Sequence, residues 1–271
     1  MGREGERERK VSGVRKFAGA NAPEVLLETT PKRVRVFFGG RIVADSTRVR
    51  LLYHGGPAPD YYFPKEDVRH DLLEATDHTT KCPVRGHARY WSVVAGKRKA
   101  ENVVWEYHDP PQDIPDISGL LSFDWDGMDA WFEEEEEVFV HPRDPYHRID
   151  VRESARHVQV RVGDTLVADS RRPVLLFETG LPVRYYLPRL DVRTDLLEER
   201  GTETACPYKG VTSAYWGPGE LTEEEDRDLA WCYERPLPGM EKIAGRIAFF
   251  NERVDLDVDD ERQDRPKTVW S

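Results

Sequence analysis

Two short motifs in the second half of the sequence combine side chains that could do chemistry. In Cys206-Pro207-Tyr208-Lys209 a thiol lies three residues before a lysine, whose ammonium group would favour the reactive thiolate. Asp191 follows a Tyr-Tyr-Leu-Pro segment and could act as a general acid or base. Each also has a structural interpretation: a buried cysteine that opens a turn, a lysine in solvent, and an aspartate that caps a helix. Cys206, Lys209 and Asp191 are the candidate catalytic residues.

Aromatic and polar side chains near these motifs could line a ligand pocket. Large aromatic rings could equally fill the core, because they bury much apolar surface. The candidate ligand-binding residues stand in both halves of the chain: Tyr186, Tyr215, Trp216 and Trp231 in the second, and Tyr62, Asp67, Cys82, Arg85, Trp91 and Trp105 in the first.

The candidates occur in both halves because the sequence is a tandem repeat. Residues 33–86 and 157–210, aligned without gaps, are identical at 25 of 54 positions. Lys209 of the second copy corresponds to Arg85 of the first. Lysine can lose its proton in a desolvated pocket, whereas arginine stays charged and binds anions as a planar fork. We therefore expect any catalysis in the second copy and a binding or structural role for the first.

Alternating and β-branched segments predict that most elements are strands. Residues 33–38 and 41–46 flank Gly39-Gly40, which is typical of a β-hairpin, and further strands are expected at 49–53, 61–63, 88–94 and 102–107. Residues 65–75 change pattern, because Val68, Leu72 and Leu73 fall on one helical face, and they predict a short amphipathic helix that the second copy repeats.

The repeat and the composition together predict the domain organisation. We expect a disordered arm at 1–20, a first domain at 21–138, a Pro-rich ordered linker at 139–153, a second domain at 154–260 and a polar tail at 261–271. A short linker would make pairing of the copies intramolecular, so we expect a pseudo-dimer of repeats within a monomer.

Charge and cysteine content disfavour several classes of partner. The net charge is -11, with basic residues interspersed among acidic ones, so nucleic acid is not expected as a partner. No apolar run reaches membrane-spanning length, and the first ten residues lack the apolar core of a signal peptide. The three cysteines form no C-x-x-C pair, which predicts a cytoplasmic protein with no structural zinc and no cofactor.

Several motifs taken together resemble one family, the domain of unknown function 427. They are V-A-D-S, Y-Y-x-P followed by D-V, C-P-x-K-G followed by Y-W, W-x-Y-x-x-P, and a closing G-x-x-x-F. The second copy, from Val158 to about Val258, matches nearly throughout. The first, from Val34 to about Glu136, matches with Arg85 in place of the motif lysine. The resemblance implies two compact, mainly-β domains of the β-tent, or Mss4-like, kind.

The resemblance also bears on chemistry. Some members of the wider fold hold zinc between two C-x-x-C knuckles, which this chain lacks. The family has been labelled nucleotidyltransferase-like, an activity that needs two or three carboxylates to hold magnesium against a triphosphate. Asp124 and Asp126 form the nearest D-x-D pair, but Phe250 and Glu252 stand in their places in the second copy, so this activity is less favoured.

Two functions from different classes remain open. The first is a small-molecule enzyme or binder with an aromatic pocket whose polar residues are Tyr186, Asp191, Cys206 and Lys209. The second is a non-catalytic scaffold or interaction protein. A common pocket for these four side chains would favour the first function, and their separation would count against an enzyme.

Overall fold

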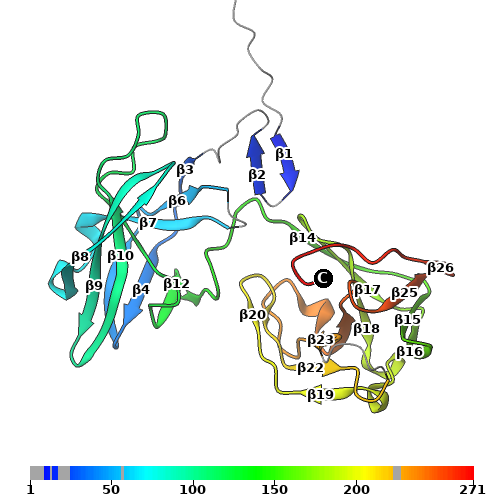
Figure 1. Cartoon of the computed structure of the whole chain (residues 1–271). Helices are drawn as coiled ribbons and strands as arrows, with labels where there is room; N and C mark the ends of the chain where they lie inside the picture. The colour runs from blue at the N-terminus through cyan, green and yellow to red at the C-terminus, as the bar shows by residue number, and fades with distance from the viewer. Residues whose placement is uncertain (1–8, 13, 18–24, 56–57, 222–226) are drawn as a thin grey trace, which may run out of the picture. The chain divides into compact units, whose positions relative to one another are not determined.

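The computed structural model describes the chain from residue 25 onward, except residues 56–57 and 222–226. It also describes the backbone of residues 9–12 and 14–17. The predicted arm at 1–20 therefore lies mostly outside the described residues. Within it, β1 (Arg9–Ser12) and β2 (Val14–Phe17) pair as an antiparallel ribbon. The chain divides into two units, Met1–Asp144 and Pro145–Ser271, and each is described by itself (Figure 1).

The first unit consists of a seven-stranded sheet and a four-stranded sheet, both antiparallel. The longest strands, β8, β9 and β10, are neighbours in the large sheet (Figure 1). In spatial order, the large sheet is β3 (Leu26–Thr29), β6 (Arg50–Tyr53), β7 (Asp60–Pro64), β11 (Leu120–Phe123), β10 (Arg98–Tyr107), β9 (Gly86–Ala95) and β8 (Leu73–Cys82). The small sheet is β13 (Glu136–Glu137), β12 (Ala130–Glu133), β4 (Val34–Phe38) and β5 (Arg41–Ser46).

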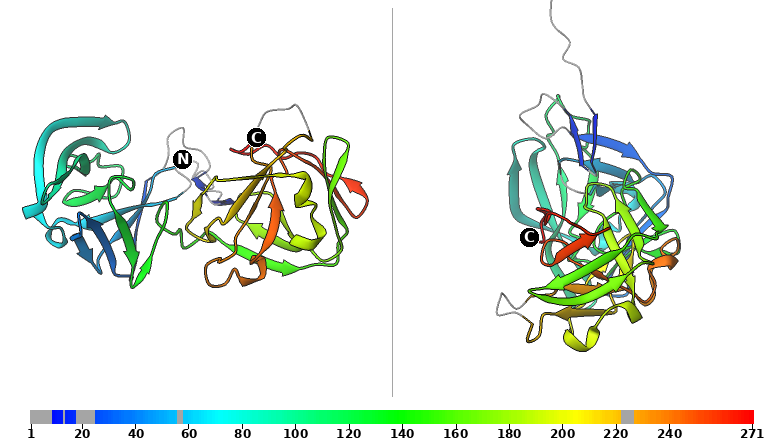
Figure 2. Two further views of the ribbon diagram at one scale, coloured as in Figure 1. Left: turned by 90° about the horizontal axis from the view of Figure 1, so that it is seen from below. Right: turned by 90° about the vertical axis from the view of Figure 1, so that its right-hand side faces the viewer.

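The second unit, coloured from green to red in Figure 2, is built from one large and one small antiparallel sheet as well. In spatial order, the large sheet is β14 (Ile149–Glu153), β17 (Val174–Glu178), β18 (Arg184–Pro188), β24 (Arg246–Phe249), β23 (Ala230–Cys232), β22 (Ala214–Gly217) and β19 (Glu198–Arg200). The small sheet is β16 (Thr165–Ser170), β15 (Val158–Val162), β25 (Asp255–Val258) and β26 (Glu261–Arg262), and β20 (Ala205–Cys206) pairs separately with β21 (Gly210–Val211).

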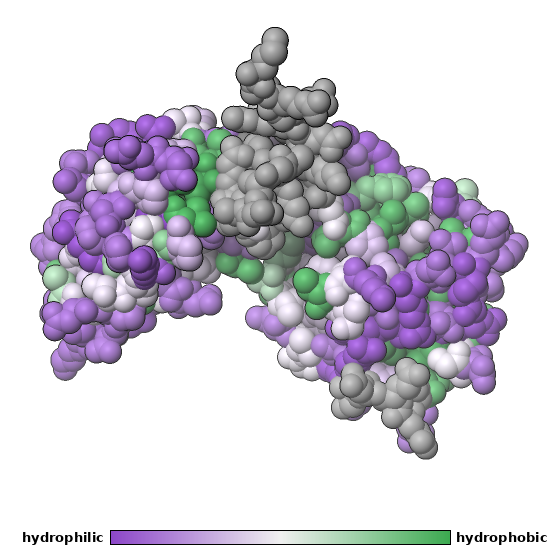
Figure 3. Space-filling model, turned by 45° about the horizontal axis from the view of Figure 1, so that its top comes forward, coloured by the Kyte–Doolittle hydropathy of each residue, from purple (hydrophilic) through white to green (hydrophobic). Residues whose placement is uncertain are grey.

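Each large sheet buries side chains on both faces, because successive residues of a strand point to opposite sides. In the second unit Leu187 packs with the small sheet, whereas its neighbour Tyr186 packs on the other face. We call the face directed away from the small sheet the distal face. In the first unit the distal face is centred on Leu52, Tyr62 and Ile117. Charged and polar side chains cover much of the visible outer surface of both units (Figure 3).

The structure confirms the predicted hairpin and corrects the predicted helix. β4 pairs with β5 across Gly39 and Gly40, both of which have positive φ. Residues 65–75 do not form an amphipathic helix. They contain two three-residue 3-10 turns, η1 (Lys65–Asp67) and η2 (His70–Leu72), before β8 begins, and the second copy has η3 (Arg189–Asp191) and η4 (Thr194–Leu196). Val68 is apolar for another reason: it lies between the two turns in extended backbone and bridges to Ala44.

Two segments outside the predicted second domain contribute to the second unit. β14 lies within the segment that the sequence assigns to the linker, and all five of its residues pair with β17. β26 lies within the predicted tail and pairs with β25. Further along the tail, Trp270 packs against the distal face. The second unit therefore draws on residues from both flanks of the repeated sequence.

Candidate functional site

A tyrosine and a tryptophan occupy the same place on the distal face of each unit. In the second unit Trp231 of β23 donates its indole N–H to the Tyr186 hydroxyl at 3.2 Å, and the two rings meet edge to face. In the first unit Trp105 donates to Tyr62, also at 3.2 Å. Burial raises the pKa of both tyrosines well above the usual value, so both stay neutral hydroxyls. Four predicted ligand-binding residues are thus brought together in pairs.

Lys209 forms a buried ion pair beside this tyrosine in the second unit. It lies in the turn between β20 and β21, where Gly210 has φ +100°, a conformation that favours glycine. Its amino group contacts the two carboxylate oxygens of Glu178, the last residue of β17, at 2.7 and 2.6 Å. The side chains of Lys209 and Glu178 are only 11% and 6% exposed. Lys209 therefore does not point into solvent.

His147 completes a cluster of three ionisable groups. Its Nε2 atom lies 3.0 Å from a Glu178 oxygen, and its ring stacks on Tyr208 with the ring centroids 4.2 Å apart. Burial raises the pKa of Glu178, but the contact with His147 and the charge of Lys209 outweigh burial and hold that pKa below its usual range. Glu178 is therefore an ionised carboxylate at neutral pH. We call Lys209, Glu178 and His147 the buried charge cluster.

Cys206 is close to the aromatic part of this site but is not the partner of Lys209. Burial raises the pKa of Tyr186 and of Tyr233, and both Glu178 and Cys206 lie near enough to raise them further. Among the described residues, the carboxylate that contacts Lys209 is Glu178, and no contact joins the lysine to the thiol. The predicted activation of Cys206 by Lys209 is therefore not supported by this geometry.

Asp191 lies apart from the buried charge cluster. It accepts hydrogen bonds from Ser170 at 2.7 Å and from Arg172 at 2.8 and 3.1 Å, which tie η3 to the end of β16. Asp67 makes the same contacts with Ser46 and Arg48 in the first unit. Neither η1 nor η3 has a side-chain cap, so the predicted capping role is wrong. Both aspartates fasten a turn to a strand.

The remaining predicted aromatic residues divide between the two faces of the large sheets. Tyr215 lies on the distal face, and its hydroxyl is 2.6 Å from that of Thr204. Its neighbour Trp216 is buried between the two sheets, as alternation in a strand requires. Trp91 packs into the corresponding core of the first unit. Trp216 and Trp91 therefore do not share a site with the buried charge cluster or with Arg85.

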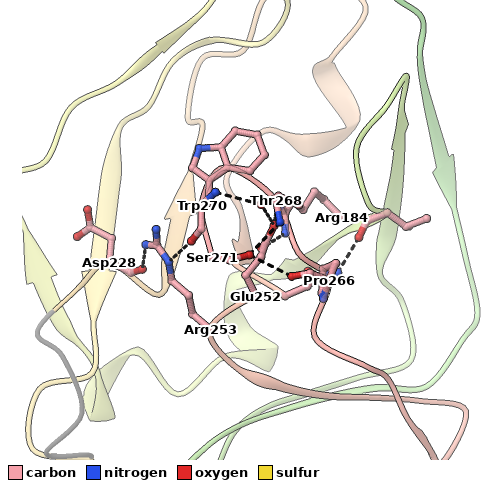
Figure 4. Close-up of polar contacts among 10 residues, drawn as sticks. Arg184, Asp228, Glu252, Arg253, Pro266, Thr268, Trp270 and Ser271 are labelled. Atoms are coloured by element: carbon pink, nitrogen blue, oxygen red, sulfur yellow. Dashed lines mark hydrogen bonds and ion pairs between the residues drawn. The ribbon is translucent and has the colours of Figure 1, made fainter. Parts of the chain in front are cut away.

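A second buried ion pair in the second unit involves the C-terminal segment (Figure 4). Arg184 and Glu252 form two hydrogen bonds, both 2.7 Å long, and the Glu252 side chain is fully buried. Thr268 donates to the same carboxylate at 2.6 Å. Trp270 lies with its ring 5.5 Å from the Arg184 guanidinium, and its carbonyl accepts from Arg253. The tail is therefore fastened to the distal face.

Sequence reasoning missed the buried partners of the predicted residues. Glu178 ends an apolar run and looks like any solvated carboxylate at a strand end, and His147 stands in the segment that the sequence assigns to the linker. Tyr233 could have been found, because it belongs to the W-x-Y motif. Arg184 and Glu252 are 68 residues apart, and no local pattern joins them.

The described residues offer no assembled metal site. Among them, no three His, Cys, Asp or Glu side chains gather in a way that could hold an ion. Asp124 and Asp126, the D-x-D pair considered above, are both exposed. Within the same residues, no helix is long and apolar enough to cross a membrane.

Comparison with known protein families assigns both units to the same family. One family model, described as Domain of unknown function (DUF427), matches twice, over residues 26–134 and 150–260. The two matches fall in the first and second units and together span most of the chain. No curated protein matches the chain. The chain therefore belongs to the DUF427 family and carries two copies of its domain.

Proposed function

We propose that the second unit binds a small molecule on its distal face, beside the buried charge cluster. The observation that carries this proposal is the burial of the Lys209–Glu178 ion pair at the end of β17, with Glu178 close enough to the buried Tyr186 to raise the pKa of that tyrosine. Removing two charges from water costs several kcal/mol per ion, which their attraction repays only in part. Buried charges with a shifted pKa concentrate at functional sites, so this cluster is the best candidate.

The surroundings of the cluster suit a flat ligand with a polar edge. The rings of Trp231 and Tyr215 pack on this face and are nearly buried. The Tyr233 hydroxyl has no hydrogen-bond partner among the residues that the structure describes, although its ring is nearly buried. Cys206 adds a partly exposed thiol. Mostly apolar walls with a few directed polar groups are typical of small-molecule sites.

If the bound molecule reacts, acid–base chemistry fits this site better than attack by the thiol. Lys209 and His147 both contact Glu178 at 3.0 Å or less, so a proton can move among three adjacent groups. Lys209 contacts Glu178, and no contact among the described residues joins it to Cys206, so the lysine does not act on the thiol directly. We therefore propose Lys209, Glu178 and His147 as the acid–base groups, with Tyr186 and Tyr233 orienting the ligand.

The competing proposal is a non-catalytic scaffold or interaction protein. The observation in its favour is that the chain's own side chains pack on this face: Tyr208 stacks on His147, and Trp270 lies over Arg184. On this view the buried charge cluster has a structural role alone and holds the turn between β20 and β21 against the end of β17. The two proposals differ in one measurable respect, because only the first requires Lys209 for binding a small molecule.

The test is a thermal-shift screen of the full chain against polar aromatic metabolites, with nucleoside triphosphates and magnesium included. Compounds that raise the unfolding temperature are then titrated by calorimetry into the wild type, Lys209→Met, Glu178→Gln and the exposed control Lys242→Met. We expect at least about tenfold weaker binding in the first two variants, from a lost charge-assisted hydrogen bond, and no change in the control. Equal affinity in all four proteins would refute the site, and the absence of any bound compound would favour the scaffold.

We also propose three broader properties. The large and small sheets of each unit would form the β-tent arrangement that the family resemblance implies. The protein would be monomeric, which light scattering over a range of concentrations would check. It would reside in the cytoplasm, because its three cysteines are all free thiols, as expected in a reducing compartment.

A further inference from the structure

The two copies differ at both positions of the ion pair described above. Subtracting the repeat offset of 124 from Lys209 gives Arg85, and subtracting it from Glu178 gives His54. The first unit therefore keeps a cation at this place on its distal face but lacks the carboxylate that neutralises it in the second unit. This difference in charge is independent of whether the second unit binds a ligand.

Arg85 has no carboxylate partner among the residues that the structure describes. Its Nε atom donates to the Cys82 sulfur at 3.5 Å, and its guanidinium lies over the Tyr107 ring, 4.9 Å from the centroid. Within the described part of the chain, neither terminal nitrogen forms a hydrogen bond to a protein oxygen. Burial lowers the pKa of Arg85, but the contact with Cys82 and the nearby Tyr62 and Tyr107 together outweigh burial and raise this pKa, so the side chain remains a half-buried cation.

The nearby carboxylates are already engaged elsewhere. Asp60 contacts His54 at 2.7 Å, and Asp109, which follows the neighbouring strand, contacts His87 at 2.9 Å. Neither forms an ion pair with Arg85. The other polar groups on this face are hydroxyls: Tyr62 accepts a hydrogen bond from Trp105 and keeps its own proton to donate, and Tyr107 has no hydrogen-bond partner among the described residues. The Tyr62 and Tyr107 hydroxyls beside Arg85 can therefore donate hydrogen bonds to a bound acceptor.

We propose that the distal face of the first unit binds a small aromatic molecule that carries an oxyanion, with a carboxylate held by the two terminal nitrogens of Arg85. A guanidinium and a carboxylate match as planar forks, and Nε is already occupied by Cys82. The Tyr62 and Tyr107 hydroxyls supply further donors. Half-buried apolar side chains beside them, Tyr90, Trp105 and Ile114, would contact the body of the ligand.

The experiment uses the full chain and three probes of similar shape: benzoate, neutral benzamide and phenyl phosphate. Binding is followed by NMR through the indole N–H of Trp105, which donates to Tyr62. We expect benzoate to bind at least about tenfold more tightly than benzamide, because a hydrogen bond to a charged group contributes about 1.5–3 kcal/mol. Tighter binding of phenyl phosphate would support the same site and assign phosphate monoesters as the source of the anion.

Two variants and a control locate the site. Arg85→Met removes the cation, and His54→Glu restores the carboxylate found in the second unit; both should weaken benzoate binding at least about tenfold. His54→Glu retains Arg85 and is checked for an unchanged unfolding midpoint, so the test does not depend on the fold of Arg85→Met. The exposed control Arg41→Met should bind as the wild type does.

Three results would overturn the proposal. They are equal binding of benzamide and benzoate, unchanged benzoate binding in Arg85→Met, and no binding of either anion up to about 10 mM, a concentration that detects even millimolar affinity. None of these results depends on Lys209, so failure here is distinguishable from failure of the site proposed for the second unit.

Discussion

Removing Lys209 should destabilise the second unit because it takes the cationic partner away from the buried Glu178 carboxylate and leaves the contact with His147. In Lys209→Met this carboxylate either stays charged or takes up a proton. Protonation at pH 7 of a carboxyl whose ordinary pKa is about 4.3 costs about 4 kcal/mol, which sets an upper limit. Breaking a buried pair by removing one partner costs about 3–5 kcal/mol in other proteins. We expect a loss of about 3 kcal/mol for Lys209→Met.

A double-mutant cycle separates the ion pair from the packing of its side chains. Glu178→Gln alone should also be destabilising, because it leaves the ammonium group half-paired, but the double variant removes both charges together. We expect the double variant to lose about 2 kcal/mol less than the sum of the single losses. Urea unfolding followed by tryptophan fluorescence measures all four free energies of unfolding.

The dependence on pH gives an independent check with a definite sign. Burial raises the pKa of Glu178, but His147 and Lys209 outweigh it and hold that pKa below the unfolded value. A carboxyl whose pKa is lower in the folded chain than in the unfolded chain stabilises the fold at pH values above its unfolded pKa. This contribution is lost as the pH falls through the folded pKa. The wild type should therefore lose stability below about pH 4.3, more steeply than Glu178→Gln.

Lys209→Met should show the opposite slope, because its buried carboxyl gains a proton more easily. Its free energy of unfolding should rise between pH 7 and pH 5 relative to the wild type. An exposed ion pair would give a different result: each single variant would lose less than about 1 kcal/mol of unfolding free energy, and the two losses would simply add. The pH profiles of Lys209→Met and the wild type would then be parallel. That outcome would refute the buried ion pair and, with it, the basis of the site.

Three further outcomes follow from contacts in the structure. Arg184→Met should cost about 3–5 kcal/mol in urea unfolding, because it leaves the fully buried Glu252 carboxylate without its cationic partner; a loss under about 1 kcal/mol would contradict this. Asp191→Asn should cost less than about 1 kcal/mol and leave ligand binding unchanged. The pKa of Asp191 is lowered by the hydrogen bond from the exposed Arg172, so its small contribution to stability should vanish as the pH falls below about 4. Weaker ligand binding in Asp191→Asn would show that Asp191 belongs to the binding site. Gly86→Ala should cost about 2 kcal/mol, because φ is +90° and the new Cβ would lie 2.6 Å from a carbonyl oxygen. Gly96→Ala, where φ is also positive but no atom lies near the new Cβ, should cost about 1 kcal/mol. Equal shifts of the unfolding temperature in the two variants would show that the close contact relaxes.

Local patterns are sufficient for the strands and insufficient for the 3-10 turns. The hairpin of β4 and β5 is specified by neighbouring residues, since alternation and the Gly39-Gly40 turn are both visible in the sequence. The spacing of Val68 and Leu72 matches a helix as well as it matches two separate turns. What decides between them is the bridge from Val68 to Ala44, a long-range contact that periodicity does not report.

The candidate site is only partly readable from the sequence for a similar reason. The motif around Lys209 indicates the cation, but its partner Glu178 is 31 residues away and lies on another strand. Adjacent aromatic residues look like the walls of one pocket, although Tyr215 and Trp216 point to opposite faces of their strand. Alternation along a strand is itself a sequence property, so assigning each residue to a face is enough to separate these two rings.

The ten-residue strand β8 has a consequence for how the first unit behaves at high concentration. It ends the large sheet, so one row of its backbone groups faces outward, and such edges can recruit strands from other molecules into aggregates. Here the pairing with β9 breaks register between Ala75 and Thr79, and Asp77 lies in that irregular stretch. A kinked edge that carries charge is a poor template for a foreign strand. The second unit limits the same hazard by length, because its edge strand β19 has only three residues.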